Sequence, residues 1–238
     1  MSTLKNKIDF ALIFTVKNAN PNGDPLGGNR PRTTSDGLGE VSDVCLKRKI
    51  RNRLQELGSE IFVQSNENSS DGQKSLSDRF NTFLATLRKD EQKAKDIVAQ
   101  KACERWIDVR SFGQVFAFKR GDNTSEVSIG VRGPVTIQSA FSVAPVIIES
   151  IQITKSVNSE TTTDGKKSSD TMGMKHRVSS AVYVTYGSIS PQLAEKTGFS
   201  DADADAIKNA LVSLFEGDES SARPSGSMQV IKVVWFLH

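Results

Sequence analysis

The strongest concentration of chemically capable side chains in the sequence is a run of basic residues near position 50. Five positive charges fall within seven residues: Lys47, Arg48, Lys49, Arg51 and Arg53. A phosphate backbone presents regularly spaced negative charge, and its neutralisation releases counterions, which gives affinity independent of sequence. The run therefore predicts contact with RNA or DNA. The alternative interpretation is an ordinary solvated face of a helix.

A second candidate is the loop over residues 18–32, which is rich in asparagine and glycine. Small residues let backbone N–H groups approach an anion, and Arg30 and Arg32 can each pair with a phosphate through two hydrogen bonds. The loop lacks the Gly-Lys-Ser/Thr ending of a P-loop, so nucleotide hydrolysis has no support here. An ordinary wide loop is the alternative.

A third candidate is a basic string that directly follows a very polar segment. Flexible methionines beside three residues that can carry positive charge suit a surface tongue that touches RNA or wedges between bases. The alternative is a plain basic entry into a strand. The string is Met172-Gly173-Met174-Lys175-His176-Arg177.

The segment from Arg110 to Phe116 faintly echoes the strand of RRM domains that stacks aromatic rings under bases. Two positions of that pattern fail in this sequence. We therefore expect Phe112 and Phe116 to be core residues.

Candidates for catalysis are few. His176 has no nucleophile or orienting acid in a recognisable motif, and Asp201, Asp203 and Asp205 have the placing of acids at a helix start. The best enzymatic interpretation is metal-dependent RNA cleavage assisted by Asp36 or Asp43. We predict that the chain is not an enzyme.

The cysteines and the bulk charge narrow the class of protein further. Cys45 and Cys103 are far apart and lack metal-ligand spacing, so we expect reduced thiols and no metal or other cofactor. The formal net charge is only +3, so any nucleic-acid role must depend on local clusters of charge. No apolar run is long enough to span a membrane and no secretory signal is recognisable, which predicts a cytoplasmic protein without a membrane partner.

The elements that must position these residues follow from hydrophobic periodicity. Residues 8–16 predict a buried strand, and Leu46, Ile50, Leu54 and Leu57 form the apolar stripe of a helix that begins near Ser42 or Asp43 and stops at Gly58. Weaker helices are expected at 76–87 and 91–106, and a second clear helix after Ser200. Further strands are expected at 106–118, 127–139, 146–154, 178–189 and 228–237.

The order strand, helix, strands, helix, strand predicts an α+β fold, a ferredoxin-like or RRM-like antiparallel sheet with helices on one face. Residues 59–105 and 150–177 read as insertions into this sheet. Residues 156–171 contain too few apolar side chains to fold alone, so we expect them to be mobile or ordered by a partner.

Four separated strings of the sequence follow one another in a recognisable order. They are Asn20-Pro21-Asn22-Gly23-Asp24-Pro25, Ser42-Asp43-Val44-Cys45-Leu46-Lys47-Arg48-Lys49-Ile50-Arg51, Gly130-Val131-Arg132-Gly133-Pro134-Val135-Thr136-Ile137-Gln138, and Thr171-Met172-Gly173-Met174-Lys175-His176 followed by Gly198-Phe199-Ser200. Together these strings resemble the type I-C CRISPR Cascade backbone subunit, the major guide-RNA-binding protein of the RAMP superfamily. The resemblance covers about residues 8–234 and is highly specific.

The resemblance implies an RRM-like palm with helical fingers and a flexible thumb. It divides the chain into a first palm half (1–58), a helical finger insertion (59–105), palm strands (106–147), a thumb (148–178) and a second palm half (179–238). Relatives of this type continue well past the last strand, so the second half is expected to be shortened at its C-terminus.

The resemblance also implies a non-catalytic subunit whose copies stack head-to-tail along the CRISPR guide RNA. Its partners would be the guide, the target DNA paired to it, other Cascade subunits and a recruited helicase-nuclease. Two rival functions remain open, namely an RNA-cleaving backbone-type subunit and a general single-stranded RNA binder. The implied RNA-binding residues are Asn20, Asn22, Arg30, Lys47, Arg48, Arg51, Met172, Lys175, His176 and Arg177.

Overall fold

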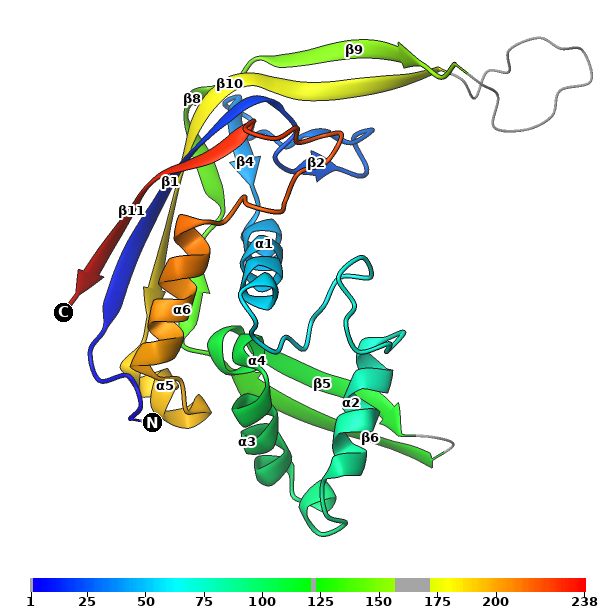
Figure 1. Ribbon diagram of the computed structural model, residues 1–238, viewed down its shortest axis with the longest axis vertical. Helices are drawn as coiled ribbons and strands as arrows, with labels where there is room; N and C mark the ends of the chain where they lie inside the picture. Colours follow the sequence, from blue (N-terminus) through cyan, green and yellow to red (C-terminus); the bar gives the residue numbers. More distant parts are fainter. Residues whose placement is uncertain (1, 121–122, 157–171) are drawn as a thin grey trace, which may run out of the picture.

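The chain builds its main sheet from strands that lie far apart in the sequence. The computed structural model describes residues 2–120, 123–156 and 172–238. Figure 1 shows a C-shaped outline, with a long hairpin at one end, the sheet and two helices in the middle, and a helical unit at the other end. The main-sheet strands are β1 (Ile8–Ala19), β4 (Leu38–Val41), β7 (Val135–Ile137), β8 (Ala140–Pro145), β9 (Ile148–Thr154), β10 (Met172–Ile189) and β11 (Met228–Leu237).

The predicted fold class is confirmed by the strand order. The sheet runs β11-β1-β10-β8-β4, with β7 and β9 also paired to β10, and every pairing is antiparallel. Helix α1 (Asp43–Glu56) follows β1 and β4, and α6 (Asp201–Val212) connects β10 to β11. With β1 and β10 central and the two helices on one face, this is the ferredoxin-like arrangement (Figure 1).

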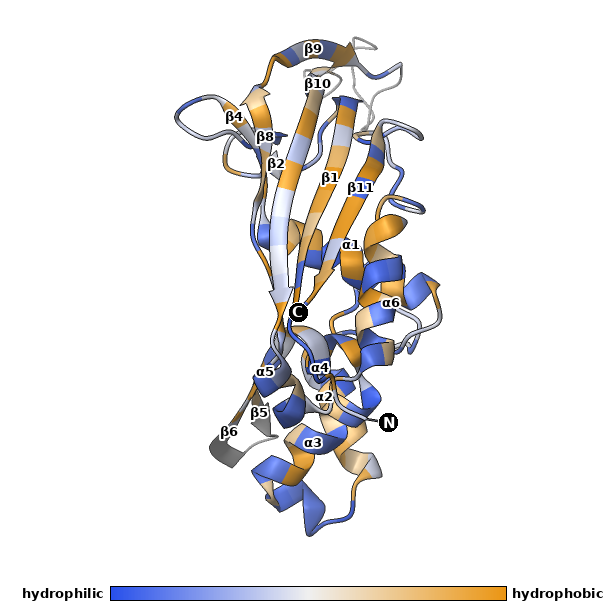
Figure 2. Ribbon diagram, turned by 90° about the vertical axis from the view of Figure 1, so that its left-hand side faces the viewer, coloured by the Kyte–Doolittle hydropathy of each residue, from blue (hydrophilic) through white to orange (hydrophobic). Residues whose placement is uncertain are grey.

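Alternation along β1 decides which face of the sheet is covered. Ile8, Phe10, Leu12, Phe14 and Val16 are buried and belong to the main core, together with the apolar stripe of α1. This is the period-2 pattern of a strand with one covered face. The alternate residues of β1, from Asp9 to Thr15, are only partly buried. Figure 2 views the sheet from its other side and shows that β1 and β11 are formed largely of hydrophobic residues.

Helices α1 and α6 begin where the sequence predicts. Ser42 caps α1, and Gly58 follows its end with a positive φ of 91°. Ser200 and Asp203 form a capping box at the start of α6, in which each side chain accepts from the backbone N–H of the other, as expected for a serine followed three residues later by an acid.

A second hydrophobic core forms outside the sheet. Phe62 packs against Trp106 at a ring-centroid distance of 4.8 Å and against Phe116 at 5.1 Å, and Phe80 stacks on Phe116 at 4.6 Å. Phe116 is therefore a core residue, as predicted. This unit contains α2 (Leu76–Thr86), the 3-10 turn η1 (Glu91–Lys93), α3 (Lys95–Arg105), α4 (Ile107–Phe112), β5 (Gly113–Arg120) and β6 (Asn123–Arg132).

The chain crosses between the two cores within single peptide units. Ile61 belongs to the main core, whereas its neighbour Phe62 belongs to the second core. On the return crossing, Trp106 lies in the second core and Ile107 in the main core. Ile107 N donates to Glu60 O at 3.1 Å, so the two crossings are hydrogen-bonded to each other.

Several predicted elements need correction. The strand expected over 106–118 is wrong in its first half, which is helix α4, and β5 pairs with β6 in a separate two-stranded sheet. The mixed apolar run of Trp106, Ile107 and Val109 is ambiguous because a helix end that contacts two cores loses its one-sided pattern.

The strand expected over 127–139 is divided into β6 and β7 at Gly133, which passes too close to the backbone of Ser111 to allow any side chain. The helix expected over 91–106 is interrupted at Ala94, and the short helix α5 (Pro191–Thr197) was not predicted. The domain boundaries given above remain a prediction.

Strands β9 and β10 continue beyond the sheet as a two-stranded hairpin. Their register runs from Val178 opposite Ile148 to Met172 opposite Thr154, and Figure 1 shows them extending away from the sheet. Strand β10 thus begins six residues before the predicted start at 178. The expectation of mobility for residues 156–171 concerns residues that, from 157 onward, lie outside the described ranges.

Candidate nucleic-acid interface

The start of helix α1 is joined to the asparagine-rich loop by hydrogen bonds. Ser42 Oγ accepts from Cys45 N at 3.3 Å, which satisfies one of the free donors at the helix N-terminus. Asn22 Oδ1 accepts from the backbone N and from Oγ of Ser42, both at 2.9 Å. The loop and the basic helix therefore form one connected unit.

Asn20 forms a hydrogen bond within the same loop. Its side chain is buried, and Nδ2 donates to Asn29 O at 2.6 Å, across the short hairpin of β2 (Gly23–Asp24) and β3 (Arg30–Pro31). Asn29 adopts a positive φ of 59°, a conformation that asparagine tolerates better than most residues. The amides of Asn20 and Asn22 thus shape the loop, and their contact with RNA stays a prediction.

The basic residues of α1 are largely committed to partners within the protein. Lys47 pairs with Asp43 at 3.0 Å. Lys49 is 5% exposed and pairs with Asp218. Arg53 pairs with Glu56 and with Glu216. Lys49 therefore lies in the interior and cannot belong to a solvated basic face, and the charges of Lys47 and Arg53 are partly offset.

Arg48 and Arg51 lie on the side of α1 that faces the second core. Arg48 Nη1 donates to Val63 O at 2.6 Å, and Arg51 Nε donates to Asp108 Oδ2 at 3.0 Å. Burial lowers the pKa of the Arg48 guanidinium, and the neighbouring positive charge of Arg51 lowers it further. Two guanidinium groups one helical turn apart favour an anion that neutralises both.

The hairpin places the residues of the third candidate on two opposite faces. Met172, Met174 and His176 alternate along β10 with Lys175 and Arg177, so the two sets point to opposite sides. Met172 is 63% exposed and Met174 is 54% exposed. On the other face, Arg177 pairs with Glu149 at 2.8 Å.

The loop and the hairpin meet through a chain of hydrogen bonds. Arg30 Nη1 donates to Ser150 Oγ at 3.1 Å, and Ser150 Oγ lies 2.9 Å from His176 Nδ1. Arg30 and His176, which are 146 positions apart in the sequence, are thereby brought to one place. The structure thus joins the loop to α1 through Asn22 and to the hairpin through Arg30.

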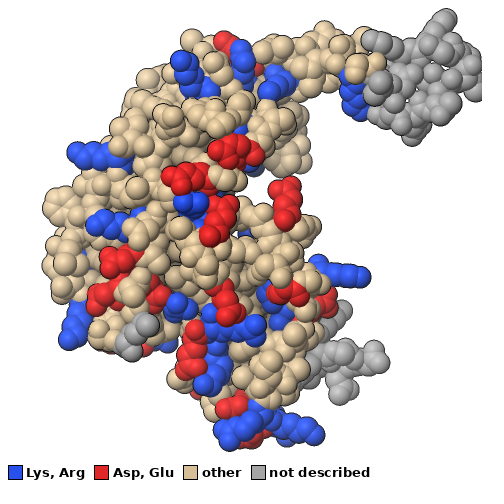
Figure 3. Space-filling view, viewed as in Figure 1, with Lys and Arg blue, Asp and Glu red and all other residues tan. Residues whose placement is uncertain are grey.

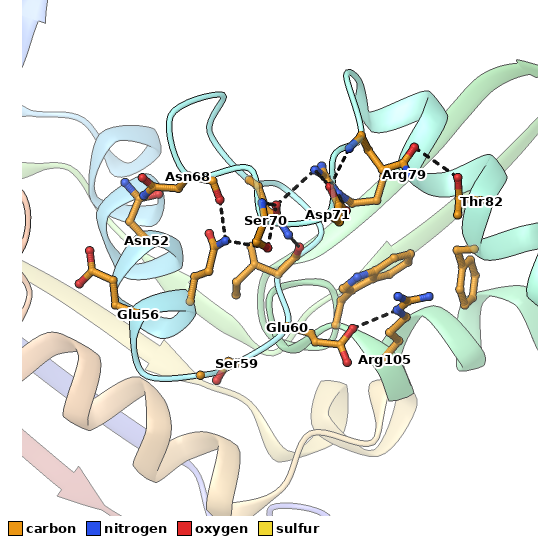
Figure 4. Close-up of a pocket in the computed structure, with 17 residues that line it drawn as sticks. Asn52, Glu56, Ser59, Glu60, Asn68, Ser70, Asp71, Arg79, Thr82 and Arg105 are labelled. Carbon is orange, nitrogen blue, oxygen red and sulfur yellow. Dashed lines mark hydrogen bonds and ion pairs between the residues drawn. The ribbon is translucent and has the colours of Figure 1, made fainter.

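A cavity beside α1 is lined by other residues than Arg30, Arg48, Arg51 and His176. It has a volume of about 530 Å³ and lies between α1, the loop over 59–73 and α2. Figure 4 shows Asn52 and Glu56 on its α1 side and Arg79 on its α2 side. Arg79 is paired with Asp71, and Arg105 pairs with Glu60 at 3.0 Å. The two arginines that line it are therefore already neutralised, which makes it a poor phosphate site.

On the face shown in Figure 3, acidic and basic side chains are interspersed, and neither charge forms a large patch of its own. Within residues 2–120, 123–156 and 172–238, no three histidine, cysteine or acidic side chains gather closely enough to hold a metal ion. Over the same ranges, the helices are too short or too polar to cross a bilayer.

Two residues of this region were missed by sequence reasoning. Ser150 bridges Arg30 and His176, and nothing in its sequence context distinguishes it from other serines. Asp108 contacts Arg51 and is 1% exposed. An acid within the otherwise apolar stretch Trp106-Ile107-Asp108-Val109 is a usable signal, because a buried charge requires a partner.

Comparison with known proteins gives the family. The sequence profile described as "CRISPR-associated protein Cas7" matches residues 6–238. The chain belongs to the Cas7 family. The predicted family resemblance is thus confirmed at this level, whereas the I-C subtype stays a prediction.

One relative is the CRISPR-associated protein Cas7 of Haloferax volcanii. It is 27% identical over 220 residues, which cover 87% of this chain and 63% of the relative. The chain therefore spans less than two thirds of the length of this Cas7 relative.

Two solved structures are similar to this chain. A chain of a "CRISPR RNA-guided surveillance complex, pre-nicking" matches with a TM-score of 0.51 and 22% identity, over 87% of this chain and 69% of that chain. A chain of a "CRISPR RNA-guided surveillance complex" matches with a TM-score of 0.47 and 19% identity, over 87% and 60%. The first likeness supports the fold of the sheet and its insertions.

Proposed function

We propose that this Cas7-family chain is a non-catalytic backbone subunit that binds the guide RNA of a type I-C Cascade surveillance complex. Membership of the Cas7 family over residues 6–238 carries the proposal. The matched range contains the basic helix, the asparagine-rich loop and the hairpin. Copies of the chain would assemble head-to-tail along the guide, and the guide would pair with target DNA.

The geometry supports binding to the phosphates of the guide RNA, and not to its bases. Arg48 and Arg51 offer guanidinium donors from one side of α1, and Arg30 offers another from the loop. Guanidinium groups pair with phosphate oxygens irrespective of the base attached. A subunit that must hold guides of any sequence requires this kind of contact.

The hairpin supports a role in assembly along the strand. Met172 and Met174 are exposed at its far end, on a strand pair that leaves the sheet. Unbranched methionine side chains adapt to irregular apolar surfaces. In the proposed assembly this hairpin, with Lys175, His176 and Arg177, acts as the thumb that contacts the guide. Other Cascade subunits would bind at the ends of the assembly, and a recruited helicase-nuclease would cut the target.

The test is co-expression of the chain with a guide RNA, followed by purification and electron microscopy. The expected result is a co-purified RNA and a helical filament that dissociates as salt rises. A protein that emerges free of nucleic acid, with no salt-dependent affinity for single-stranded RNA, would contradict the proposal. Binding of RNA without any filament would instead favour a general single-strand binder.

A cleavage assay separates the proposal from the enzymatic rival. The purified particle is incubated with Mg²⁺ and an RNA complementary to the guide, beside Asp36→Ala and Asp43→Ala variants. We expect intact RNA in all samples. Periodic cuts that disappear in either variant would make the chain a nuclease.

A further inference from the structure

The carboxylate of Asp108 joins three parts of the chain at the boundary between the two cores. The side chain is 1% exposed. Its Oδ1 accepts from Phe62 N at 2.8 Å, and its Oδ2 accepts from Val63 N at 3.1 Å and from Arg51 Nε at 3.0 Å. Asp108 therefore ties helix α4, the crossing segment and the basic helix α1 together.

This contact fixes the orientation of Arg51 but leaves its outer donors available. Asp108 bonds only Nε, and the Phe112 ring lies 5.1 Å from the guanidinium carbon. Within the described part of the chain, the two terminal nitrogens of Arg51 have no hydrogen-bond partner. They form the planar fork that binds two oxygens of one phosphate. The fork is held before any ligand arrives, so less side-chain entropy is lost on binding.

The same carboxylate acts on Arg48 through the backbone. Val63 N is held by Asp108, and Val63 O accepts from Arg48 Nη1 at 2.6 Å. The position of Val63 thus sets the position of the Arg48 guanidinium. Two guanidinium groups and one carboxylate carry a net charge of +1, which one phosphodiester group would balance.

The ion pair between Arg110 and Asp203 is a useful contrast, because every guanidinium nitrogen of this arginine is hydrogen-bonded inside the protein. Arg110 donates to Asp203 Oδ1 from Nε at 3.0 Å and from Nη2 at 2.7 Å, and its Nη1 donates to Cys103 O at 3.2 Å. All three nitrogens of Arg110 are used inside the protein. Arg51 uses only one, which is the arrangement of a side chain that is oriented for an outside ligand.

We propose that Asp108 is a positioning residue that holds Arg51, and through Val63 also Arg48, as a paired site for one backbone phosphate of the bound strand. The inference rests on the proposed function, because it assumes that the strand is RNA. Asp108 itself does not touch the phosphate, and acts only through the two arginines.

The experiment measures affinity for an unstructured single-stranded RNA against salt concentration, by fluorescence anisotropy, with the full chain. The variants are Asp108→Asn, Arg51→Ala and the double variant. Asp108→Asn is expected to weaken binding by about 10-fold and to lower the salt slope by about 0.7, the amount for one lost phosphate contact on a single strand. In the Arg51→Ala background, Asp108→Asn should have a clearly smaller effect, because Asp108 can then act only on Arg48 through Val63.

Two further variants keep the test independent of folding. Asp203→Asn breaks the closed pair with Arg110, and it should lower the unfolding midpoint without changing the salt slope. Arg51→Lys keeps the charge, but an ammonium group lacks the fork that can hold Asp108 and phosphate together. It should therefore lose RNA affinity while the chain stays folded.

The outcomes distinguish the inference from the function on which it rests. If Asp108→Asn weakens RNA binding equally with and without Arg51, Asp108 only stabilises the fold and the inference is overturned. If Arg51→Lys binds RNA as tightly as the unmodified chain, the oriented fork is irrelevant and the inference is also overturned. If the unmodified chain shows no salt-dependent RNA affinity, the proposed function itself fails.

Discussion

Helix α1 and the β9–β10 hairpin both carry residues that we predict contact RNA, yet their side chains have opposite environments. On α1, Lys49, Arg51 and Arg53 each have a carboxylate partner within the protein. On the hairpin, Met172 and Met174 are mostly exposed. The helix is a surface whose geometry is fixed before binding, whereas the hairpin presents apolar side chains that gain burial only from a partner.

This difference separates two ways of contributing to affinity. A preorganised cation loses little conformational entropy when it meets a phosphate. An exposed methionine contributes through the apolar area that it buries on contact, about 25 cal/mol per Å². Changes in α1 should therefore affect the stability of the free protein, and changes in the hairpin should not.

The largest expected effect comes from the interior of α1. Lys49→Ala removes one of the two cationic partners of Asp218, the other being Arg223, and breaks a buried charged hydrogen bond, which should lower the free energy of unfolding by about 3 kcal/mol. The matched control is Lys47→Ala on the same helix, whose partly exposed pair with Asp43 should contribute about 0.5 kcal/mol or less. Urea denaturation measures both, and equal losses would contradict the assignment of Lys49 to the interior.

A smaller effect is expected on RNA binding. Lys47→Ala combined with Arg51→Ala should weaken affinity for single-stranded RNA of any sequence by about 10- to 100-fold at low salt and reduce the salt slope. Lys101→Ala combined with Arg105→Ala, on helix α3 of the second core, removes the same charge and serves as control.

Arg51 also partners the buried Asp108, so circular dichroism must confirm that the double variant is folded. Arg48→Ala, which breaks only a bond to a backbone carbonyl, provides a second variant. Affinity equal to the unmodified chain at every salt concentration would remove α1 from the interface.

The second core, which lies beside α1, contains a buried cysteine thiol, and its burial predicts that stability depends on pH. Burial raises the pKa of the Cys103 thiol from 9.0 to about 11. The folded chain therefore holds the thiol proton more tightly than the unfolded chain, so this contribution to stability is complete below pH 9.0 and is lost as pH rises toward about 11.

Urea midpoints of the unmodified chain and of Cys103→Ala measure the contribution of this thiol. The unmodified chain should lose more stability than the variant between about pH 8 and about pH 10.5. Parallel losses in the two proteins would mean that the thiol is not protected.

The smallest expected effect on stability concerns the β9–β10 hairpin. Met172→Ala combined with Met174→Ala should change the free energy of unfolding of the isolated chain by less than about 0.5 kcal/mol, as usual for exposed positions. The same change should reduce the yield of RNA-bound filament in co-expression. A marked loss of stability in the isolated chain would mean that the hairpin packs on its own protein.

Sequence reasoning reached the sheet and its helices because their signals are local. The alternation of β1, the stripe of α1 and the caps Ser42 and Ser200 depend on nearest neighbours along the chain. The same reasoning failed at α4, where Trp106 and Ile107 point into different cores. A hydrophobic pattern assumes that a segment packs against one core. It cannot show that two adjacent residues pack into two different cores.

The sequence predicted which basic residues belong to the candidate interface, but it did not predict which of them pair with carboxylates inside the protein. The basic run at 47–53 was found from composition, whereas the partners of Lys49 and Arg51 are 169 and 57 positions away. Ion pairs at such separations depend on tertiary structure. For the same reason the chain from Arg30 through Ser150 to His176 could not be derived from spacing.

The crossing of the chain between Ile61 and Phe62 has a consequence for protein engineering. Because neighbouring side chains anchor different cores, a shift of one residue there would exchange an anchor of one core for an anchor of the other. A chimaera that exchanges the helical unit between relatives should therefore retain residues 60–63 and 106–109 from a single parent. A splice point inside the loop over 64–75, combined with a second one before residue 106, would leave both crossings and the carboxylate of Asp108 intact.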